Sequence, residues 1–160
     1  LDKNGKIRDL SSHISDLNTK NINFETLSKL QKIDLGTLPE VPNSTRIGPC
    51  INQPGKFIGI GLNYSDHAAE TGAKPPSEPI VFMKATSCII GPNDDVIIHK
   101  NSKKTDWEVE LAVVIGKKGN YISETDAVDH IAGYVLHNDV SEREFQLGPI
   151  VAIFVSGILL

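Results

Sequence analysis

The segment that most constrains the fold is 106–115, in which acidic and apolar side chains alternate before a continuous apolar run. Alternate residues of a β-strand project to the same face, so the sequence predicts a strand that places Glu108 and Glu110 together, with Asp106 near its start. We expect the longest strand of the chain here, over 107–115. The intervening side chains would point into apolar packing on the opposite face: Trp107, Val109 and Leu111.

Two carboxylates beside each other on such a strand are unfavourable, because like charges repel and a buried charge without a partner costs several kcal/mol. A bound divalent cation removes that cost, since hard ions such as Mg²⁺ take carboxylate oxygens as ligands. The alternative is a solvated strand face with Lys103 and Lys104 as neighbours. The spacing alone leaves both interpretations open.

Short apolar segments separated by glycine, proline and asparagine indicate a β-rich α+β fold. Asn23 precedes apolar residues at helical spacing, which predicts a capped helix whose apolar stripe packs in a core. The glycine- and proline-rich stretch 36–55 indicates a linker, so residues 1–50 would form a small N-terminal subdomain with its linker. Other strands are expected over 57–60, 80–83, 96–98 and 131–136, and a short helix over 124–130.

The composition indicates a globular chain with one main domain. Of its 160 residues 39% are hydrophobic, and 16 Lys and Arg against 20 Asp and Glu give a formal charge of −4. That balance argues against nucleic-acid binding, which favours basic faces, and provides no polybasic anchor for a membrane. Cys50 and Cys88 have no metal or redox spacing, and the first residues lack an apolar leader. We therefore expect a cytoplasmic protein without disulfides.

A third acid, Asp139, follows the predicted strand 131–136 and precedes Arg143 and Gln146. An acid at the end of a strand, followed by these donors, can supply a further metal ligand and groups that hold a substrate oxygen. The alternative is the start of an ordinary helix, with Asp139 as its cap and Arg143 pairing at helical spacing. Taken by themselves, these residues favour the helix start.

A polar cluster at 63–72 contains His67 and Glu70 three residues apart. The sequence predicts a short helix that ends at Gly72 and makes His67 and Glu70 neighbours on one face. A glutamate beside an imidazole can orient it and raise its basicity, as a general base requires. The alternative is an exposed helix with a casual ion pair, worth about 1 kcal/mol or less. The other histidines lack such a partner and are expected to lie at the surface or to be incidental to function: His13, His99, His130 and His137.

Together these segments resemble the fumarylacetoacetate hydrolase family, in its bacterial branch of ureidoglycolate lyases, hydroxyhepta-diene-dioate isomerases and diketo-acid hydrolases. The resemblance covers about residues 1–147, in order and with natural spacing. It implies a partial β-roll of this family's catalytic domain over 51–147, after the N-terminal subdomain. The matching stretches are 58–70, 78–84, 91–94, 105–111 and 138–143.

The resemblance also implies roles for particular residues. Glu108, Glu110 and Asp139 match the family's ligands for Mg²⁺ or Mn²⁺. His67 and Glu70 match a pair on a mobile helix that activates water. The remaining matches are Arg143 and Gln146, which hold developing oxyanion charge, and Lys84 and Tyr64, which bind the substrate.

The implied function is that of a metal-dependent hydrolase, isomerase or lyase that acts on a small 2-oxo or 2,4-dioxo carboxylic acid through a metal-bound enolate. In the full-length family the expected assembly is a homodimer. The match ends near Leu147, and an apolar stretch follows to residue 160. We expect the first half of such an enzyme with an aberrant tail over 148–160, for which a buried terminal strand is the alternative. Two other functions stay open: an inactive remnant that binds only a metal or a partner subunit, and a carbohydrate- or protein-binding β module.

Overall fold

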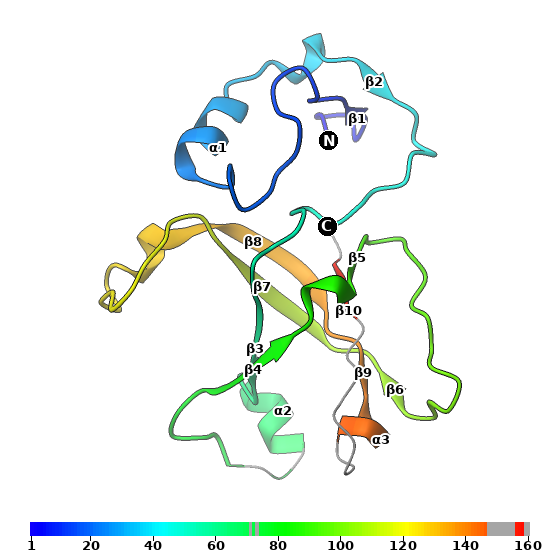
Figure 1. The fold of residues 1–160 in the computed structure, drawn as a ribbon, viewed down its shortest axis with the longest axis vertical. Helices are drawn as coiled ribbons and strands as arrows, with labels where there is room; N and C mark the ends of the chain where they lie inside the picture. The colour runs from blue at the N-terminus through cyan, green and yellow to red at the C-terminus, as the bar shows by residue number, and fades with distance from the viewer. Residues whose placement is uncertain (71, 73, 147–155, 159–160) are drawn as a thin grey trace.

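The computed structural model describes residues 1–70, 72, 74–146 and 156–158, the last three as backbone (Figure 1). These residues form a β-rich α+β fold with few, short helices, as predicted. Figure 1 shows the N-terminal segment at one end, α2 and α3 at the other, and the long β7–β8 pair between them. The strands are β1 (Ile7–Arg8), β2 (Glu40–Val41), β3 (Phe57–Gly61), β4 (Ile80–Lys84), β5 (Ile89–Ile90), β6 (Thr105–Asp106), β7 (Val109–Ile115), β8 (Ile131–Asn138), β9 (Ser141–Glu142) and β10 (Ser156–Ile158). The α-helices are α1 (Phe24–Leu30), α2 (Ser65–Glu70) and α3 (Arg143–Gln146), and the 3₁₀ helices are η1 (Leu35–Thr37), η2 (Thr86–Cys88) and η3 (Ala127–His130).

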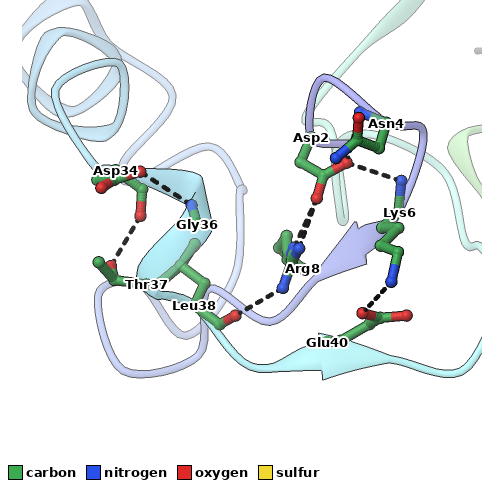
Figure 2. A network of polar contacts seen from close by, with 9 residues as sticks. All are labelled: Asp2, Asn4, Lys6, Arg8, Asp34, Gly36, Thr37, Leu38 and Glu40. Carbon is green, nitrogen blue, oxygen red and sulfur yellow. Dashed lines mark hydrogen bonds and ion pairs between the residues drawn. The ribbon is translucent and has the colours of Figure 1, made fainter.

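The N-terminal segment is organised around Asp2, beside the antiparallel pair β1–β2. The Asp2 carboxylate accepts hydrogen bonds from the backbone amides of Asn4 and Lys6 and pairs with Arg8 (Figure 2). Arg8 also donates to the carbonyl of Leu38, which is buried. Because of these bonds, the Lys6 amide foremost, the pKa of Asp2 is lowered to about 2. Strand β2 and η1 therefore belong to this folded segment, although β2 and the last two residues of η1 lie in the stretch that the sequence predicts as a linker.

Helix α1 begins where the sequence predicts, because the side chain of Asn23 accepts a hydrogen bond from the amide of Thr26. Its apolar stripe is less buried than predicted. Phe24 is exposed, Leu27 and Leu30 are half-buried, and the helix has no buried residue. The prediction of a core-packed stripe was therefore wrong for this helix.

The largest sheet has the strand order β5-β10-β8-β7. β7 and β8 are antiparallel, and their register places Glu110 directly opposite His137. β10 lies between β8 and β5, antiparallel to the first and parallel to the second. The alternative for the tail, a buried terminal strand, is not tested, because residues 147–155 and 159–160 lie outside the described residues. The aberrant tail and the domain boundary at residue 50 both stay predictions.

Strands β3 and β4 form a separate antiparallel pair in which Phe57 lies opposite Lys84. Gly59 lies opposite Phe82, whose ring covers the glycine so closely that a Cβ at position 59 would clash with it. This contact explains why a glycine occupies position 59 of the strand. The pair places Phe57 and Lys84 as neighbours, and both lie against the end of β8, as described below.

Several predicted elements differ in the structure. The segment 107–115 is not the longest strand, because β7 begins only at Val109 and β8 is longer. Residues 96–98 belong to no strand, and Ile97 and Ile98 are exposed. The predicted helix 124–130 is reduced to η3. A short apolar run does not form a strand without a neighbouring strand to pair with, and the local sequence does not show which strand that is.

One face of the β7–β8 pair is apolar and exposed, contrary to the prediction that Trp107, Val109 and Leu111 point into apolar packing. Trp107 is 71% exposed and Leu111 60%. The register pairs Leu111 with Leu136 and Val113 with Tyr134, so this exposed apolar face extends across both strands. The buried side chains of the described residues are mainly polar: Lys84, His130, His137, Asp139, Ser141 and Glu142, against Leu38, Ala68 and Val140. Among the described residues, more polar than apolar side chains are therefore buried.

We expect Asp2→Asn to destabilise the β1–β2 pair at pH 7. A carboxyl group with a lowered pKa stabilises the fold above its unfolded value, here 3.8, and loses that contribution as the pH falls to about 2. The thermal melting of the native NMR signals of Ile7 and Val41 should differ between wild type and variant at pH 7 and converge near pH 2. Glu25→Gln, at an exposed helical ion pair, is the control. A difference that is independent of pH would contradict this account.

We expect the double variant Leu111→Thr, Leu136→Thr to bind less of the dye ANS and to self-associate less than wild type. Both side chains are largely exposed, so their replacement removes apolar surface from water at a cost of about 1 kcal/mol or less. ANS fluorescence and sedimentation velocity measure the change. Ile97→Thr, which is exposed outside this face, is the control, and a large loss of stability in the double variant would contradict the exposed position.

Candidate metal and active site

Three carboxylates converge where β7 begins and β8 ends. The Asp139 amide donates to the Glu108 carbonyl at 2.7 Å, which continues the β7–β8 pairing one step beyond β8. Asp139 thus lies opposite Glu108, as His137 lies opposite Glu110. Each acid offers a carboxylate oxygen within 4.8 Å of the other two. The three acids meet as the sequence interpretation requires, while their role as ligands stays a prediction.

The donor set of this acid cluster, Glu108, Glu110 and Asp139, fits a hard divalent cation. All three donors are oxygens, on one buried and two half-buried side chains. Mg²⁺ and Ca²⁺ bind oxygen at roughly 2.0–2.6 Å, so ligands on opposite sides of one ion lie roughly 4–5 Å apart. The spacing of the acid cluster does not exceed that range. Among the described residues it is the only group of three or more side chains with metal-binding spacing.

Lys84 forms an ion pair with Asp139 in the interior, where the two residues are 2% and 3% exposed. Burial lowers the pKa of the Lys84 ammonium group to about 8, while Glu110 and Glu108 act in the opposite direction. The amine is therefore charged at neutral pH and compensates Asp139. The alternative prediction, Asp139 as a helix cap, is wrong, because the chain forms β9 before α3 begins at Arg143.

Arg143 binds two acids at once. Its guanidinium lies 2.9 Å from Asp106 Oδ2 and contacts Glu108 Oε1, and its Nη1 donates to Gln146 Oε1 at 2.9 Å. Burial alone would lower the pKa of Arg143, but the hydrogen bonds to Glu108 and Asp106 raise it. The two residues predicted to hold oxyanion charge, Arg143 and Gln146, are thus in contact with each other, and Arg143 orients Glu108.

Helix α2 carries His67 and Glu70 and follows Tyr64, whose hydroxyl contacts β7. The Leu111 amide, next to Glu110, donates to the Tyr64 hydroxyl at 3.0 Å, and Ala68 is buried. Beyond the helix Gly72 adopts a φ of +68, as a C-terminal glycine commonly does. His67 is half-buried and Glu70 exposed. The structure thus has the predicted helix, whereas a catalytic role for the pair stays a prediction.

Two histidines that the sequence places at the surface are buried. His137 is 2% exposed, with Nδ1 3.6 Å from Glu110 Oε2 and its ring edge-on to Phe57 at 5.2 Å. His130 is buried with Nδ1 2.9 Å from the Lys117 carbonyl. The signal for His137 was present, because it alternates with Asp139 along a strand and therefore shares its face. His13 and His99 are exposed as predicted.

Another acid that sequence reasoning missed is Glu142, a buried residue of β9. Its carboxylate accepts hydrogen bonds from the hydroxyls of Ser102 and Thr105 and from the Lys104 amide at 2.9 Å. Because its oxygens are engaged by the segment around β6, Glu142 joins β9 to β6. It thereby anchors the chain that leads into Arg143.

A cavity of about 820 Å³ opens beside Glu110 and His137. Its walls include Phe57 and Tyr64 and, from the N-terminal segment, Ile22. The acid cluster is therefore next to a space large enough for a small molecule, and the N-terminal segment forms part of its wall.

Within the described residues no helix is long and apolar enough to span a membrane.

Comparison with known proteins places these features in a family. Residues 56–150 match the family model for the fumarylacetoacetate hydrolase C-terminal domain. A protein of Burkholderia ambifaria that carries the general name of a hydrolase is 56% identical over 147 residues, which are 92% of this chain and 52% of that protein. The chain spans about half the length of the curated relatives it matches.

Solved structures are similar over the same part of the chain. Fumarylacetoacetate hydrolase from Exiguobacterium antarcticum has a TM-score of 0.68 at 29% identity and covers 89% of this chain, which corresponds to 51% of that protein. 5-Carboxymethyl-2-hydroxymuconate delta-isomerase from Mycobacterium smegmatis has a TM-score of 0.54 at 32% identity, over 64% of this chain and 43% of that protein. The neighbours thus include both a hydrolase and an isomerase.

We expect Lys84→Met to lower the free energy of unfolding by about 3–5 kcal/mol, because it leaves the buried Asp139 carboxylate without its compensating charge. Urea denaturation at pH 7 followed by circular dichroism measures the loss. Lys103→Met, at an exposed position of the neighbouring loop, should change little. Adding Asp139→Asn to the Lys84→Met variant should restore part of the stability. Equal stability of Lys84→Met and wild type would show that the buried ion pair does not stabilise the fold.

Proposed function

Because the chain belongs to the fumarylacetoacetate hydrolase family, we propose that it carries the divalent-metal site of an enzyme that hydrolyses, isomerises or cleaves a small 2-oxo or 2,4-dioxo carboxylic acid. The observation that carries this proposal is the convergence of Glu108, Glu110 and Asp139 within 4.8 Å at the end of β8. Hydrolase and isomerase neighbours support both reaction types. A cytoplasmic location and a homodimer belong to the same proposal.

In this proposal the three acids hold Mg²⁺ or Mn²⁺. When bound, such an ion acts as a Lewis acid that polarises substrate oxygens and stabilises the negative charge that develops on them. The acids are half-buried or buried and already face one another, so little side-chain movement is needed to bind the ion. Arg143 orients Glu108 through its guanidinium, and Lys84 orients Asp139.

Lys84 and Arg143 also determine which substrates fit. They place two cationic groups beside the acids, and a charged amine or guanidinium attracts the carboxylate of an oxo acid. Tyr64 lines the adjacent cavity and contributes a hydroxyl near the same space. The proposed substrate is therefore a small anion with vicinal oxygens, because it can bind to a cation at one end and to these donors at the other.

Proton transfer in this proposal is the task of α2. His67 takes a proton from water in hydrolysis, or from a substrate carbon in isomerisation, and Glu70 orients its imidazole. Support comes from the position of the helix: the Tyr64 hydroxyl, just before α2, is bonded to the Leu111 amide next to Glu110. Closure of this helix over the cavity would exclude water from the reacting atoms.

Calorimetric titration with Mn²⁺ tests the metal site directly. We expect the wild-type chain to bind one ion, and Glu108→Gln and Glu110→Gln to bind it at least 100-fold more weakly, because each variant removes one charged ligand. Glu124→Gln removes the same charge at an exposed position away from the acid cluster and should bind as wild type does. Equal affinity in all variants would refute the site.

Turnover of an acylpyruvate tests the reaction, and the loss of the substrate's enol absorbance measures it. We expect Mn²⁺-dependent turnover that His67→Asn abolishes while leaving Mn²⁺ affinity unchanged, because His67 moves a proton and does not bind the ion. Turnover without metal would contradict the proposal. Mn²⁺ binding with no turnover would favour the alternative that this chain only binds a metal or a partner subunit.

A further inference from the structure

His137 is a buried side chain that the proposed reaction does not use. It lies on β8 directly opposite Glu110, with its Nδ1 3.6 Å from Glu110 Oε2. The edge-on contact with Phe57, at 5.2 Å between ring centroids and 77° between planes, keeps the imidazole from turning away. Phe57 is itself held in β3 opposite Lys84. The histidine is thus fixed between an aromatic ring and one acid of the cluster.

The surroundings of the two ring nitrogens determine the tautomer. Nε2 is buried and has no hydrogen-bond partner among the described residues. A proton on Nε2 would be an unpaired buried donor and would leave the Nδ1 lone pair facing the Glu110 carboxylate, and both are unfavourable. The proton therefore belongs on Nδ1, directed at Glu110. At 3.6 Å the contact is electrostatic, and a shift of Glu110 by about half an ångström makes it a hydrogen bond.

His137 does not have the position of a ligand. The group whose donor atoms all lie within 4.8 Å of one another contains the three acids and not His137. The arrangement instead gives each acid one nitrogen partner: Asp139 has Lys84, Glu108 has Arg143 and Glu110 has His137. Carboxylates that bind metals are commonly oriented by such partners, whose loss typically weakens metal affinity about 10–100-fold.

We propose that His137 is a positioning residue that holds the Glu110 carboxylate in the orientation for binding a divalent cation. This inference rests on the proposed metal site and adds to it the residue that orients its third ligand. An imidazole can donate a hydrogen bond without carrying a charge, so this kind of partner can orient a carboxylate without adding a cation beside it.

Titration with Mn²⁺ tests the proposal, and the electron paramagnetic resonance signal of the free ion measures how much remains unbound. We expect His137→Phe, which keeps an aromatic ring against Phe57 but has no Nδ1, to weaken Mn²⁺ affinity about 10–100-fold. His137→Asn, whose amide nitrogen is bonded to Cγ as Nδ1 is and takes about its place, should recover part of that loss. Should the phenylalanine variant not fold, His137→Leu, which fills the site with apolar atoms and has no nitrogen, carries the same expectation.

His130→Phe is the matched control, because it also removes a buried imidazole that contacts a single oxygen. It should lower the melting temperature but leave Mn²⁺ affinity unchanged. Wild-type affinity in His137→Phe or His137→Leu would overturn the inference, and so would a direct ¹⁴N coupling to Mn²⁺ in pulsed spectra of the wild type, which would make His137 a ligand. If Glu110→Gln also binds as wild type does, the metal site itself is refuted and not only the role of His137.

Discussion

The structure depends on the compensation of three carboxylates that lie within 4.8 Å of one another. Such a group is unstable by itself, because like charges at this distance repel strongly where water is excluded. Two cations from different parts of the chain reduce the repulsion: Lys84 pairs with Asp139, and Arg143 contacts Glu108. The imidazole of His137 faces the third acid. Balanced in this way, the cluster can be buried and still offer oxygens to a divalent ion.

The same contacts hold separate strand pairs together. Phe57 and Lys84 are neighbours across β3 and β4, and they meet His137 and Asp139 at the end of β8. Arg143 joins α3 to β6 and to the start of β7 through Asp106 and Glu108. Because few apolar side chains are buried in the described part of the chain, these polar contacts are a main link between the sheets. The residues proposed to bind a metal are therefore also residues on which the fold depends.

In most sheets with one buried face the apolar side chains are turned inward, whereas in the β7–β8 pair the polar side chains are. The face with Glu110 and His137 is turned inward, and the apolar face with Leu111 and Leu136 is exposed. An exposed apolar area of this kind is typical of surfaces that contact further protein. The chain spans about half the length of its curated relatives, and the activity proposed above is that of the family's whole enzyme. The acid cluster itself is made entirely within the described residues.

The sequence by itself determined the alternation that puts Glu108 and Glu110 on one face, the capped helix α1 after Asn23, and, through its motifs, membership of the family. These features are local, because strand and helix periodicity and capping depend on residues close in the chain. Only the tertiary structure decided that Asp139 pairs with Lys84, that His137 is buried against Glu110, and that Trp107 and Leu111 face outward. Each of these depends on which strand lies beside which and in what register. The alternation of His137 with Asp139 indicates a shared face, but not the strand that lies opposite it.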